Sequence, residues 1–352
     1  MSKNKTLNAA AKAKQDEFYT RLVDIENELR HYTKHFAGKT VLCNCDDPYE
    51  SDFFKYFAIY FNQLGLRKLI TTCYAGSPIV QTELDFWGTA NENPHFDKRK
   101  HAIKLEVSEV RDLNGDGATD LADVKLLLEN NRNVVTYLEG DGDFRSQECK
   151  DALSEADIVV TNPPFSLFRQ YVKQLVDADK KFLIIGNMNA VTYKEIFKLI
   201  QENKIWLGYG FRNMVGFFRS PYEDTAAASQ HRDGMISNSG VHWFTNMDVS
   251  KRHEEITLFK RYAQEPELFP RYDNYDAIEV PKTAFIPCDY DGVMGVPITF
   301  LDRYNPAQFE ILGNSDMFAG EIVINGKLNK NPGRFYVNGK RMYDRILIRR
   351  RA

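Results

Sequence analysis

A strand, a tight proline-rich turn and a helix follow one another near the middle of the chain, and this run most constrains the fold. The apolar stretch 157–161 is typical of a buried strand, and residues 166–178 carry apolar side chains at helical spacing. The turn between them consists of Asn162, Pro163, Pro164 and Phe165. In open α/β sheets, the turns that follow the strands form the edge at which ligands bind.

The residue types in this turn suit a flat substrate that carries an amine. The side-chain oxygen of Asn162 and a backbone carbonyl can both accept hydrogen bonds from an –NH2 group, because Pro164 supplies no N–H to compete. The ring of Phe165 can stack on the plane that carries the amine. An ordinary strand-to-turn boundary is the alternative, since Asn-Pro is also a common way to begin a turn.

Strands and helices alternate around this turn, which predicts an α/β fold with a doubly wound, mostly parallel sheet. Helices are expected at 8–31, 51–64, 166–178 and 192–203. Strands are expected at 39–45, 67–74, 134–138, 157–161, 181–186, 205–209 and 241–247. Acidic or amide residues follow several of these strands, so they are expected to gather at one edge of the sheet.

The turn after the first predicted strand carries Asp46 and Asp47, followed by Pro48, and has no glycine before Gly65. A glycine-rich turn lets backbone N–H groups approach a phosphate, so its absence argues against NAD or ATP. The two carboxylates instead suit a cationic or hydroxyl-bearing ligand. Capping of the following helix, alongside Ser51, explains at least one of them equally well.

Residues 75–133 are predicted to form an insertion before the next sheet strand, and they contain an acidic loop. The loop matches the calcium-binding loop of an EF-hand, with Gly117 at the obligatory glycine and Asp123 where glutamate is usual. We therefore predict a structural Ca2+ site, with an ion-free Asp/Asn/Gly turn as the alternative. The residues assigned to the ion are Asp112, Asn114, Asp116, Ala118 and Asp123.

The composition changes after about residue 260, where prolines and aromatic residues become more frequent. An Asn-Gly pair within 334–343 predicts a hairpin, and from there to the end the only acid is Asp344. Basic residues interleaved with aromatics can bind phosphates and stack on bases, although a solvated basic tail is the alternative. The predicted nucleic-acid contacts are Arg334, Lys340, Arg341, Arg345, Arg349, Arg350 and Arg351.

Composition and charge limit the compartment and the binding partners that we expect for the protein. The formal net charge is −3, so any contact with nucleic acid requires a local basic face. We find neither a signal peptide in residues 1–15 nor an apolar stretch of spanning length, and we expect a cytoplasmic protein without a membrane partner. The five cysteines form no CxxC pair, which favours reduced thiols over zinc ligands or disulfides.

The chain resembles the EcoRI-type adenine-N6 DNA methyltransferases, which use S-adenosylmethionine (SAM), over nearly its whole length. The tetrapeptide NPPF is shared with methylases of RNA and of protein glutamine, whereas the long C-terminal stretches are more specific. The matching stretches are DEFYT, VLCNCDDPYESDFFKYF, GDGDF, TNPPF, VHWFTN, YDNYDAIEV and DYDGVMGVPITFLDRYNPAQFEILG.

The resemblance implies a class I SAM-dependent methyltransferase fold, Rossmann-like, with a catalytic domain at 1–260 and a smaller target-recognition region at 261–352. Its implied catalytic residues are Asn162, Pro163, Pro164 and Phe165. Its implied SAM contacts are Phe18, Tyr19, Thr20, Asp46, Asp47, Pro48, Asp141, Phe144 and Asn162. Tyr49, Glu50 and Ser51 depart from the glycine pattern usual after Asp-Pro, and no acid for the SAM ribose follows the second strand directly.

The implied reaction is methylation of the exocyclic amine of an adenine that has been rotated out of double-stranded DNA, at sites distributed over the nucleoid. A cognate restriction endonuclease is the implied partner. Three alternatives remain open at this point. An RNA-adenine methyltransferase or a protein-glutamine methyltransferase would use the same four residues of the turn, and a catalytically inactive relative would only bind DNA.

Overall fold

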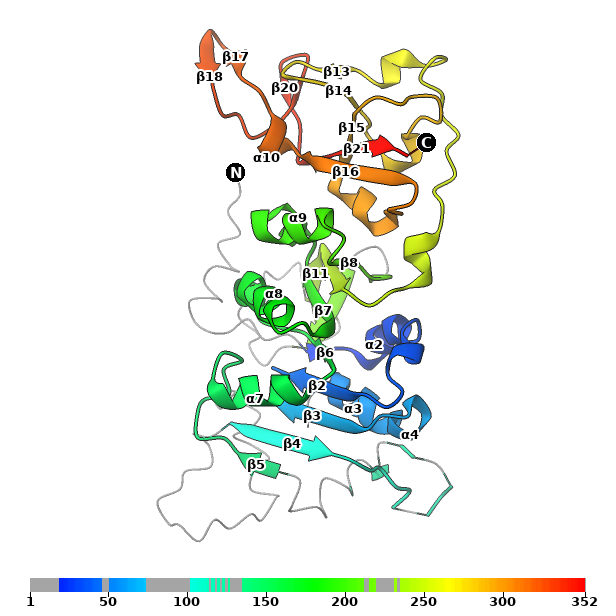
Figure 1. Ribbon diagram of the computed structural model, residues 1–352, viewed down its shortest axis with the longest axis vertical. Coiled ribbons are helices and arrows are strands. Elements are labelled where there is room, and N and C mark those ends of the chain that lie inside the picture. The colour runs from blue at the N-terminus through cyan, green and yellow to red at the C-terminus, as the bar shows by residue number, and fades with distance from the viewer. Residues whose placement is uncertain are drawn as a thin grey trace. The chain divides into compact units, whose positions relative to one another are not determined.

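The computed structural model folds into two compact units (Figure 1). One unit comprises Met1–Met188 with Gly210–Met247, and the other comprises Asn189–Tyr209 with Asp248–Ala352. The residues that the structure describes are 19–45, 51–73, 102–113, 115–117, 119–120, 122–123, 126, 135–211, 215–219, 231–232 and 235–351. The segment 189–209 packs with the C-terminal unit, whereas the functional division of the chain at residue 260 remains a prediction.

A mixed sheet forms the core of the first unit, which makes the fold mixed α/β. The strands of this unit lie in the order β5-β4-β3-β2-β6-β7-β12. The four strands from β3 to β7 are parallel, while β4 and β12 run antiparallel to their inner neighbours and β5 runs antiparallel to β4. The strands are β2 (Thr40–Asn44), β3 (Lys68–Thr72), β4 (Ile103–Val107), β5 (Val135–Tyr137), β6 (Ile158–Thr161), β7 (Lys181–Asn187) and β12 (Val241–Thr245).

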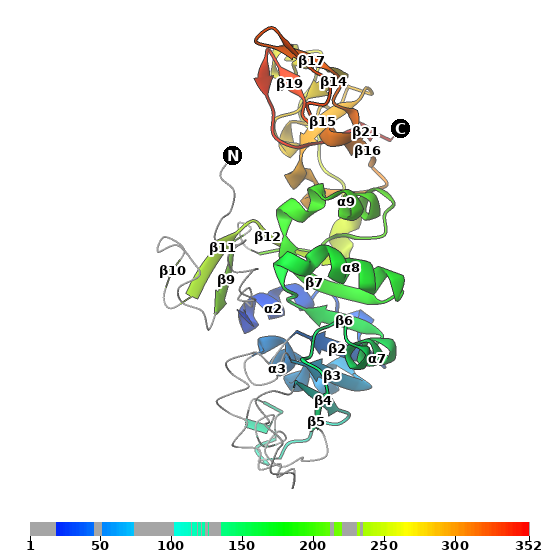
Figure 2. The same cartoon turned by 90° about the vertical axis from the view of Figure 1, so that its left-hand side faces the viewer.

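Helices cover both faces of this sheet (Figure 2). Successive residues of β12 point to opposite faces: Trp243 packs edge-on against Phe53 of α3, and Phe244 packs against Phe168 of α8. Helix α3 begins after Ser51, whose side chain accepts from the N–H of Phe53, as a capping serine should. The helices of this unit are α2 (Leu22–Leu29), α3 (Asp52–Ile59), α4 (Phe61–Leu64), α7 (Gln147–Glu155) and α8 (Phe168–Asp177).

A second, smaller antiparallel sheet in the same unit has the order β1-β9-β11-β10. Its strands are β1 (Tyr19–Thr20), β9 (Val215–Arg219), β10 (His231–Arg232) and β11 (Met235–Ser239). Tyr19 and Thr20 therefore lie in a strand, where the sequence pattern predicted a helix, because they pair with β9, a partner far away in the sequence. The helix itself begins only at Leu22.

The second unit is built on a five-stranded sheet in the order β13-β14-β15-β21-β16. Those strands are β13 (Arg271–Tyr272), β14 (Tyr275–Glu279), β15 (Met294–Pro297), β16 (Phe309–Asn314) and β21 (Arg345–Arg350). Two hairpins accompany it, namely β17 (Ile322–Ile324) with β18 (Lys327–Asn329) and β19 (Tyr336–Val337) with β20 (Lys340–Arg341). The remaining elements include α9 (Lys194–Gln201), β8 (Trp206–Leu207) and α10 (Ser315–Phe318).

Most predicted strands of the catalytic sheet are present, but the proposed insertion at 75–133 is partly wrong. Strand β4 lies inside that range and joins the sheet between β3 and β5. The predicted Asn-Gly hairpin near the C-terminus is confirmed as β19–β20, with both turn residues at positive φ. Among the described residues, none of the helices is long and apolar enough to span a membrane.

Candidate active site

The turn predicted to be catalytic, residues 162–165, is anchored at the carboxyl ends of β2 and β6. All four residues of β6 are buried, because the strand is central in the sheet. The hydroxyl of Thr161 donates a hydrogen bond to the backbone carbonyl of Asn44, the last residue of β2. Tyr171 of α8 donates its hydroxyl to the side-chain oxygen of the same Asn44. The end of β2, the end of β6 and helix α8 are thereby fixed to one another, just where the turn begins.

Asn162 is the first residue of the turn, and its side chain is 9% exposed. Its Nδ2 donates to Oγ1 of Thr20 at 3.4 Å. Pro163 is buried, whereas Pro164 and Phe165 are half-buried. Phe165 opens a short 3-10 helix, Phe165–Leu167, that leads directly into α8. The turn therefore combines a nearly buried carboxamide with a half-buried aromatic ring.

Thr20 is the described member of the predicted SAM segment that touches the catalytic turn. It is buried and pairs with Phe218 of β9. Two residues further on, the N–H of Leu22 donates a hydrogen bond of 3.0 Å to Oδ2 of Asp52, the first residue of α3. The strand that carries Thr20 is thus held on both sides. Tyr19 also lies in β1, whereas Phe18, Asp46, Asp47 and Pro48 lie outside the described residues.

The loop after β5 approaches the same end of α8. Phe144 is buried and packs edge-on against the ring of Tyr171, with 5.0 Å between the ring centroids. Gly142 has φ +79, and a Cβ there would lie 2.2 Å from the carbonyl oxygen of Cys73. Asp141 is exposed and accepts from the N–H of Asp143. The loop is thus closely packed at Gly142 and Phe144, while the Asp141 carboxylate faces solvent.

A buried thiol lies beneath this loop. Sγ of Cys149 lies 3.5 Å from the carbonyl oxygen of Gly142, and burial raises the pKa of the thiol above its ordinary value. Cys149 therefore remains protonated at neutral pH, which fits a role in packing rather than in nucleophilic chemistry.

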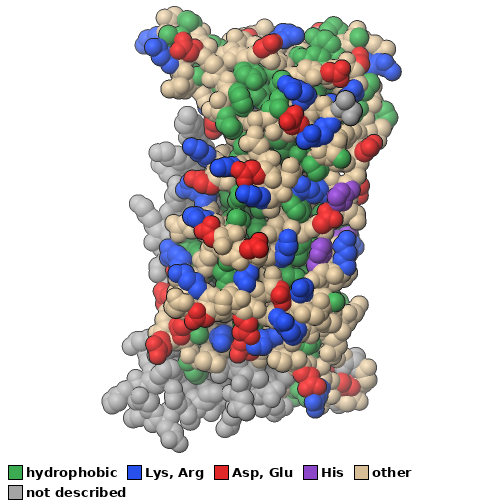
Figure 3. All heavy atoms as spheres, in the orientation of Figure 1, with side chains coloured by type: hydrophobic (Ala, Val, Ile, Leu, Met, Phe, Trp, Pro, Cys, Tyr) green, Lys and Arg blue, Asp and Glu red, His purple; other side chains and the backbone are tan. Residues whose placement is uncertain are grey.

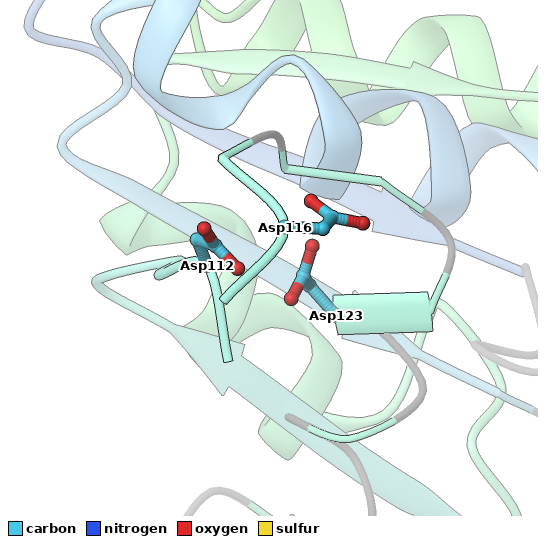
Figure 4. Close-up of side chains that lie close together, drawn as sticks. All are labelled: Asp112, Asp116 and Asp123. Carbon is cyan, nitrogen blue, oxygen red and sulfur yellow. The ribbon is translucent and has the colours of Figure 1, made fainter. Parts of the chain in front are cut away.

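Three carboxylates of the acidic loop come together within the first unit. Each of Asp112, Asp116 and Asp123 offers an oxygen within 4.8 Å of the others (Figure 4). Asp112 accepts backbone N–H bonds from Gly115 and Gly117, and Asp123 is fully buried. Asn114 and Ala118, the other two residues predicted to bind the ion, lie outside the described residues.

The seven basic residues predicted to contact nucleic acid divide into two groups. Arg345 is buried and forms an ion pair with Glu279 at 2.6 Å, so its guanidinium belongs to the interior of the second unit. Arg334 is paired with Asp316 and Asp344. Arg350 and Arg351 donate to backbone carbonyls of Cys288 and Pro306, respectively. Lys340, Arg341 and Arg349 are exposed, and so is Arg351 despite its hydrogen bond.

Acidic and basic side chains are mixed on the face of the protein that Figure 3 shows. On the face turned towards the viewer in Figure 3, basic and acidic side chains are interspersed rather than segregated. Attraction of a polyanion therefore has to come from a local element, as the net charge already suggested.

The sequence matches the family described as adenine-specific methyltransferase EcoRI over residues 6–351. The chain belongs to this family. It is therefore a SAM-dependent DNA methyltransferase specific for adenine.

Curated relatives cover nearly the full length of the chain. The Type II methyltransferase M.EcoRI of Escherichia coli is 46% identical over 92% of this chain and 94% of its own. M.MgeORF184P of Mycoplasma genitalium is 35% identical over 97% of this chain and 98% of its own, and M.MpnI of Mycoplasma pneumoniae is 35% identical over 98% of both. No solved structure matches the chain.

The model of this methyltransferase adds residues that sequence reasoning missed. Asn44 and Tyr171 hold the catalytic turn, yet neither carries a motif of its own. Tyr171 was predicted only as part of the apolar stripe of its helix. A hydroxyl on an otherwise apolar buried face was the available signal, because a buried hydroxyl requires a hydrogen-bond partner.

Proposed function

We propose that the methyltransferase acts through Asn162, Pro163, Pro164 and Phe165 at the carboxyl end of β6, on an adenine amine in duplex DNA. The observation that supports this most directly is the placement of the turn. Strand β2 has β3 on one side and β6 on the other, so the chain reverses its direction of winding between β2 and β6. In doubly wound sheets, ligands bind in the crevice at such a reversal.

The fold is proposed to be the class I, Rossmann-like methyltransferase fold. Four parallel strands, β3-β2-β6-β7, flanked by helices on both faces, support this assignment. Antiparallel β12 beside β7 is compatible with it, because doubly wound sheets often carry an antiparallel strand near the edge.

The residues near the reversal suit SAM. Asn162 is a buried polar residue just after β6, and the buried Thr20 of β1 is hydrogen-bonded to it. Phe144, in the loop after β5, packs against Tyr171 of α8. We propose that these residues, with the Asp141 carboxylate and with Phe18, Tyr19, Asp46, Asp47 and Pro48, hold the cofactor. When bound, SAM supplies a methyl group already activated by its sulfonium, so no strong general base is required.

The turn itself performs the remaining chemistry. A base within a duplex hides its amine, so the adenine must be rotated out at a cost of roughly a few kcal/mol. Stacking on Phe165 offsets part of this cost. The Asn162 side chain and the Pro163 carbonyl each accept a hydrogen bond from the adenine amine. These two hydrogen bonds direct the lone pair of the nitrogen towards the methyl group. Positive charge develops on the amine during transfer, so these acceptors stabilise the transition state more than the ground state.

Replacement of Asn162 by alanine tests this proposal. We expect Asn162→Ala still to bind SAM, because the other proposed contacts remain, and to lose methyl transfer to DNA. Normal turnover by this variant would reject the assignment of the catalytic turn. Offering labelled SAM together with duplex DNA, RNA or protein then distinguishes the adenine-DNA reaction from its two alternatives, because only the true substrate acquires label. A chain that binds DNA but not SAM would be an inactive relative.

A structural calcium ion is proposed for the acidic loop. The clustering of Asp112, Asp116 and Asp123, together with the EF-hand spacing and the positive φ of Gly117, supports it. We expect Ca2+ to raise the melting temperature of the wild-type protein and not that of Asp123→Asn. Glu109→Gln, which removes an exposed carboxylate outside the loop, should keep the calcium response. An equal response in all three proteins would reject the site.

DNA contacts are proposed for Lys340, Arg341 and Arg349, which are exposed. Arg334, Arg350 and the exposed Arg351 also contact other residues of the protein. We also propose a cognate restriction endonuclease as partner, and action on nucleoid DNA in the cytoplasm. Mapping N6-methyladenine in cells that express the protein tests activity and reveals the recognised site together. Absence of the modification in those cells would count against the function.

A further inference from the structure

The β17–β18 hairpin presents an apolar pair to solvent. Val323 of β17 lies opposite Leu328 of β18, and these side chains are 63% and 53% exposed. Its turn is Asn325-Gly326, with both residues at positive φ, as a two-residue hairpin turn requires. Two directly paired apolar residues on an exposed ribbon are costly to leave in water, which suggests that a partner covers them.

Two exposed lysines lie close to this pair in the sequence, while the exposed Glu321 directly precedes β17. From Ile322 to Met342 the sequence contains no Asp or Glu. Lys327 and Lys330, on and just after β18, are exposed, and neither forms an ion pair with any described residue. In Figure 3, basic side chains lie at the surface at the upper left, where Figure 1 places this hairpin. The charge around the hairpin is thus complementary to a polyanion.

The β19–β20 hairpin of the same unit also carries exposed cations. It turns through Asn-Gly as well, and its second strand consists of the exposed Lys340 and Arg341. The carboxylate of Asp273 accepts from the N–H groups of Asn338 and Gly339, at 3.1 and 2.7 Å, and so fixes this turn. One unit therefore carries two Asn-Gly ribbons, each with two exposed cations beside its turn or just beyond it.

We propose that the β17–β18 hairpin is a DNA-reading element that enters the major groove of the substrate duplex, with Val323 and Leu328 against base edges and Lys327 and Lys330 on phosphates. The proposal rests on the proposed function, since it takes duplex DNA as the partner. None of these four residues was among the nucleic-acid contacts predicted from the sequence. The β19–β20 hairpin would bind the neighbouring backbone through Lys340 and Arg341.

The dimensions and chemistry of the ribbon fit this partner. The major groove of B-DNA admits a two-stranded β-ribbon, and each base pair presents a distinct pattern there. Apolar side chains contact the thymine methyl group, whereas lysines on phosphates add affinity without sequence information. The two kinds of residue are therefore expected to have separable effects, one on specificity and the other on salt dependence.

A pair of double variants tests both roles in the full-length protein. The probe is a short duplex that contains the methylation site found by mapping, compared with a duplex in which that site is scrambled. Lys327→Ala/Lys330→Ala should weaken binding to both duplexes on the order of tenfold. Loss of two phosphate contacts should also reduce the salt slope by about 1.8, at about 0.9 for each contact. Val323→Ser/Leu328→Ser should keep the slope and lower the preference for the true site.

Controls separate the possible failures. Lys194→Ala/Lys198→Ala on α9 removes two exposed lysines from the same unit and should leave affinity and slope unchanged. SAM binding and thermal melting verify that each variant is folded. If the wild-type protein methylates DNA adenine and the hairpin variants match it in affinity, slope and site preference, this inference is wrong while the function stands. If Val323→Ser/Leu328→Ser instead dissolves a wild-type dimer and leaves DNA binding intact, the hairpin is a self-association surface and the inference is likewise wrong.

Discussion

Nδ2 of Asn162 donates to Oγ1 of Thr20 at 3.4 Å, and this bond joins the amide predicted to be catalytic to strand β1. The oxygen and nitrogen of a carboxamide lie in one plane, on opposite sides of the Cβ–Cγ bond axis, so an amide that donates to Thr20 presents its oxygen away from Thr20. We propose that this oxygen accepts a hydrogen bond from the adenine amine. A residue of the predicted SAM segment is thus hydrogen-bonded to the residue that we propose binds the substrate.

Thr20→Val keeps the shape of the side chain and removes its acceptor. A hydrogen bond of this kind contributes roughly 0.5–1.5 kcal/mol, so we expect kcat to fall by up to about tenfold. SAM affinity should change less, and Thr20→Ser should restore kcat because it retains the hydroxyl. Single-turnover methylation and SAM titration measure the two effects. A Thr20→Val enzyme with wild-type kcat would show that the amide is oriented by something else.

Gly142 and Gly240 provide a matched pair for the loop after β5. Both have positive φ, +79 and +77, but a Cβ on Gly142 would meet Cys73 and Ala102, whereas one on Gly240 would meet nothing within 4 Å. Gly240→Ala should therefore cost only the backbone strain, about 1–2 kcal/mol. Gly142→Ala should cost more in urea unfolding and should weaken SAM binding. Equal losses for the two variants would mean that the packing around Gly142 is not tight.

The sequence predicted the strand, turn and helix around Asn162 well because their signals are local. The apolar run before Asn162 and the helical spacing after Phe165 lie within one short stretch, and neither depends on a distant partner. The strand Tyr19–Thr20 was mistaken for helix because it is specified by pairing with β9, about two hundred residues away. Strand β4 was missed for a similar reason, since it is defined by its place between β3 and β5.

The basic tail illustrates a different limit of sequence reading. Arg345 and Arg349 look alike in the sequence, yet one is buried against Glu279 and the other is exposed. Which arginine turns inwards depends on the position of an acid sixty-six residues away on β14. Composition alone could therefore identify the basic segment, but not the residues within it that are available to DNA.

Tyr272 should make the stability of the second unit sensitive to alkaline pH. Burial, followed by the neighbouring Glu279 carboxylate, raises the pKa of Tyr272 far above its ordinary value of 10.0. The folded state thus keeps this proton where the unfolded state loses it. The stabilisation is complete below pH 10 and is lost as the pH rises above it. Tyr272→Phe should reduce the alkaline slope of unfolding free energy by up to about 1.4 kcal/mol per pH unit, whereas Tyr343→Phe, at an exposed position, should leave it unchanged.

Arg345 and Arg349 make opposite predictions for stability and for DNA binding. Arg345→Ala leaves the Glu279 carboxylate buried without its cation, which should cost about 3–5 kcal/mol in urea unfolding. Arg349→Ala should change stability by less than about 0.5 kcal/mol, because its side chain is exposed. If Arg349 binds a phosphate, its loss should lower the salt slope of DNA binding by about 0.9. A stable Arg345→Ala protein with a reduced salt slope would reverse the two assignments and return Arg345 to the DNA surface.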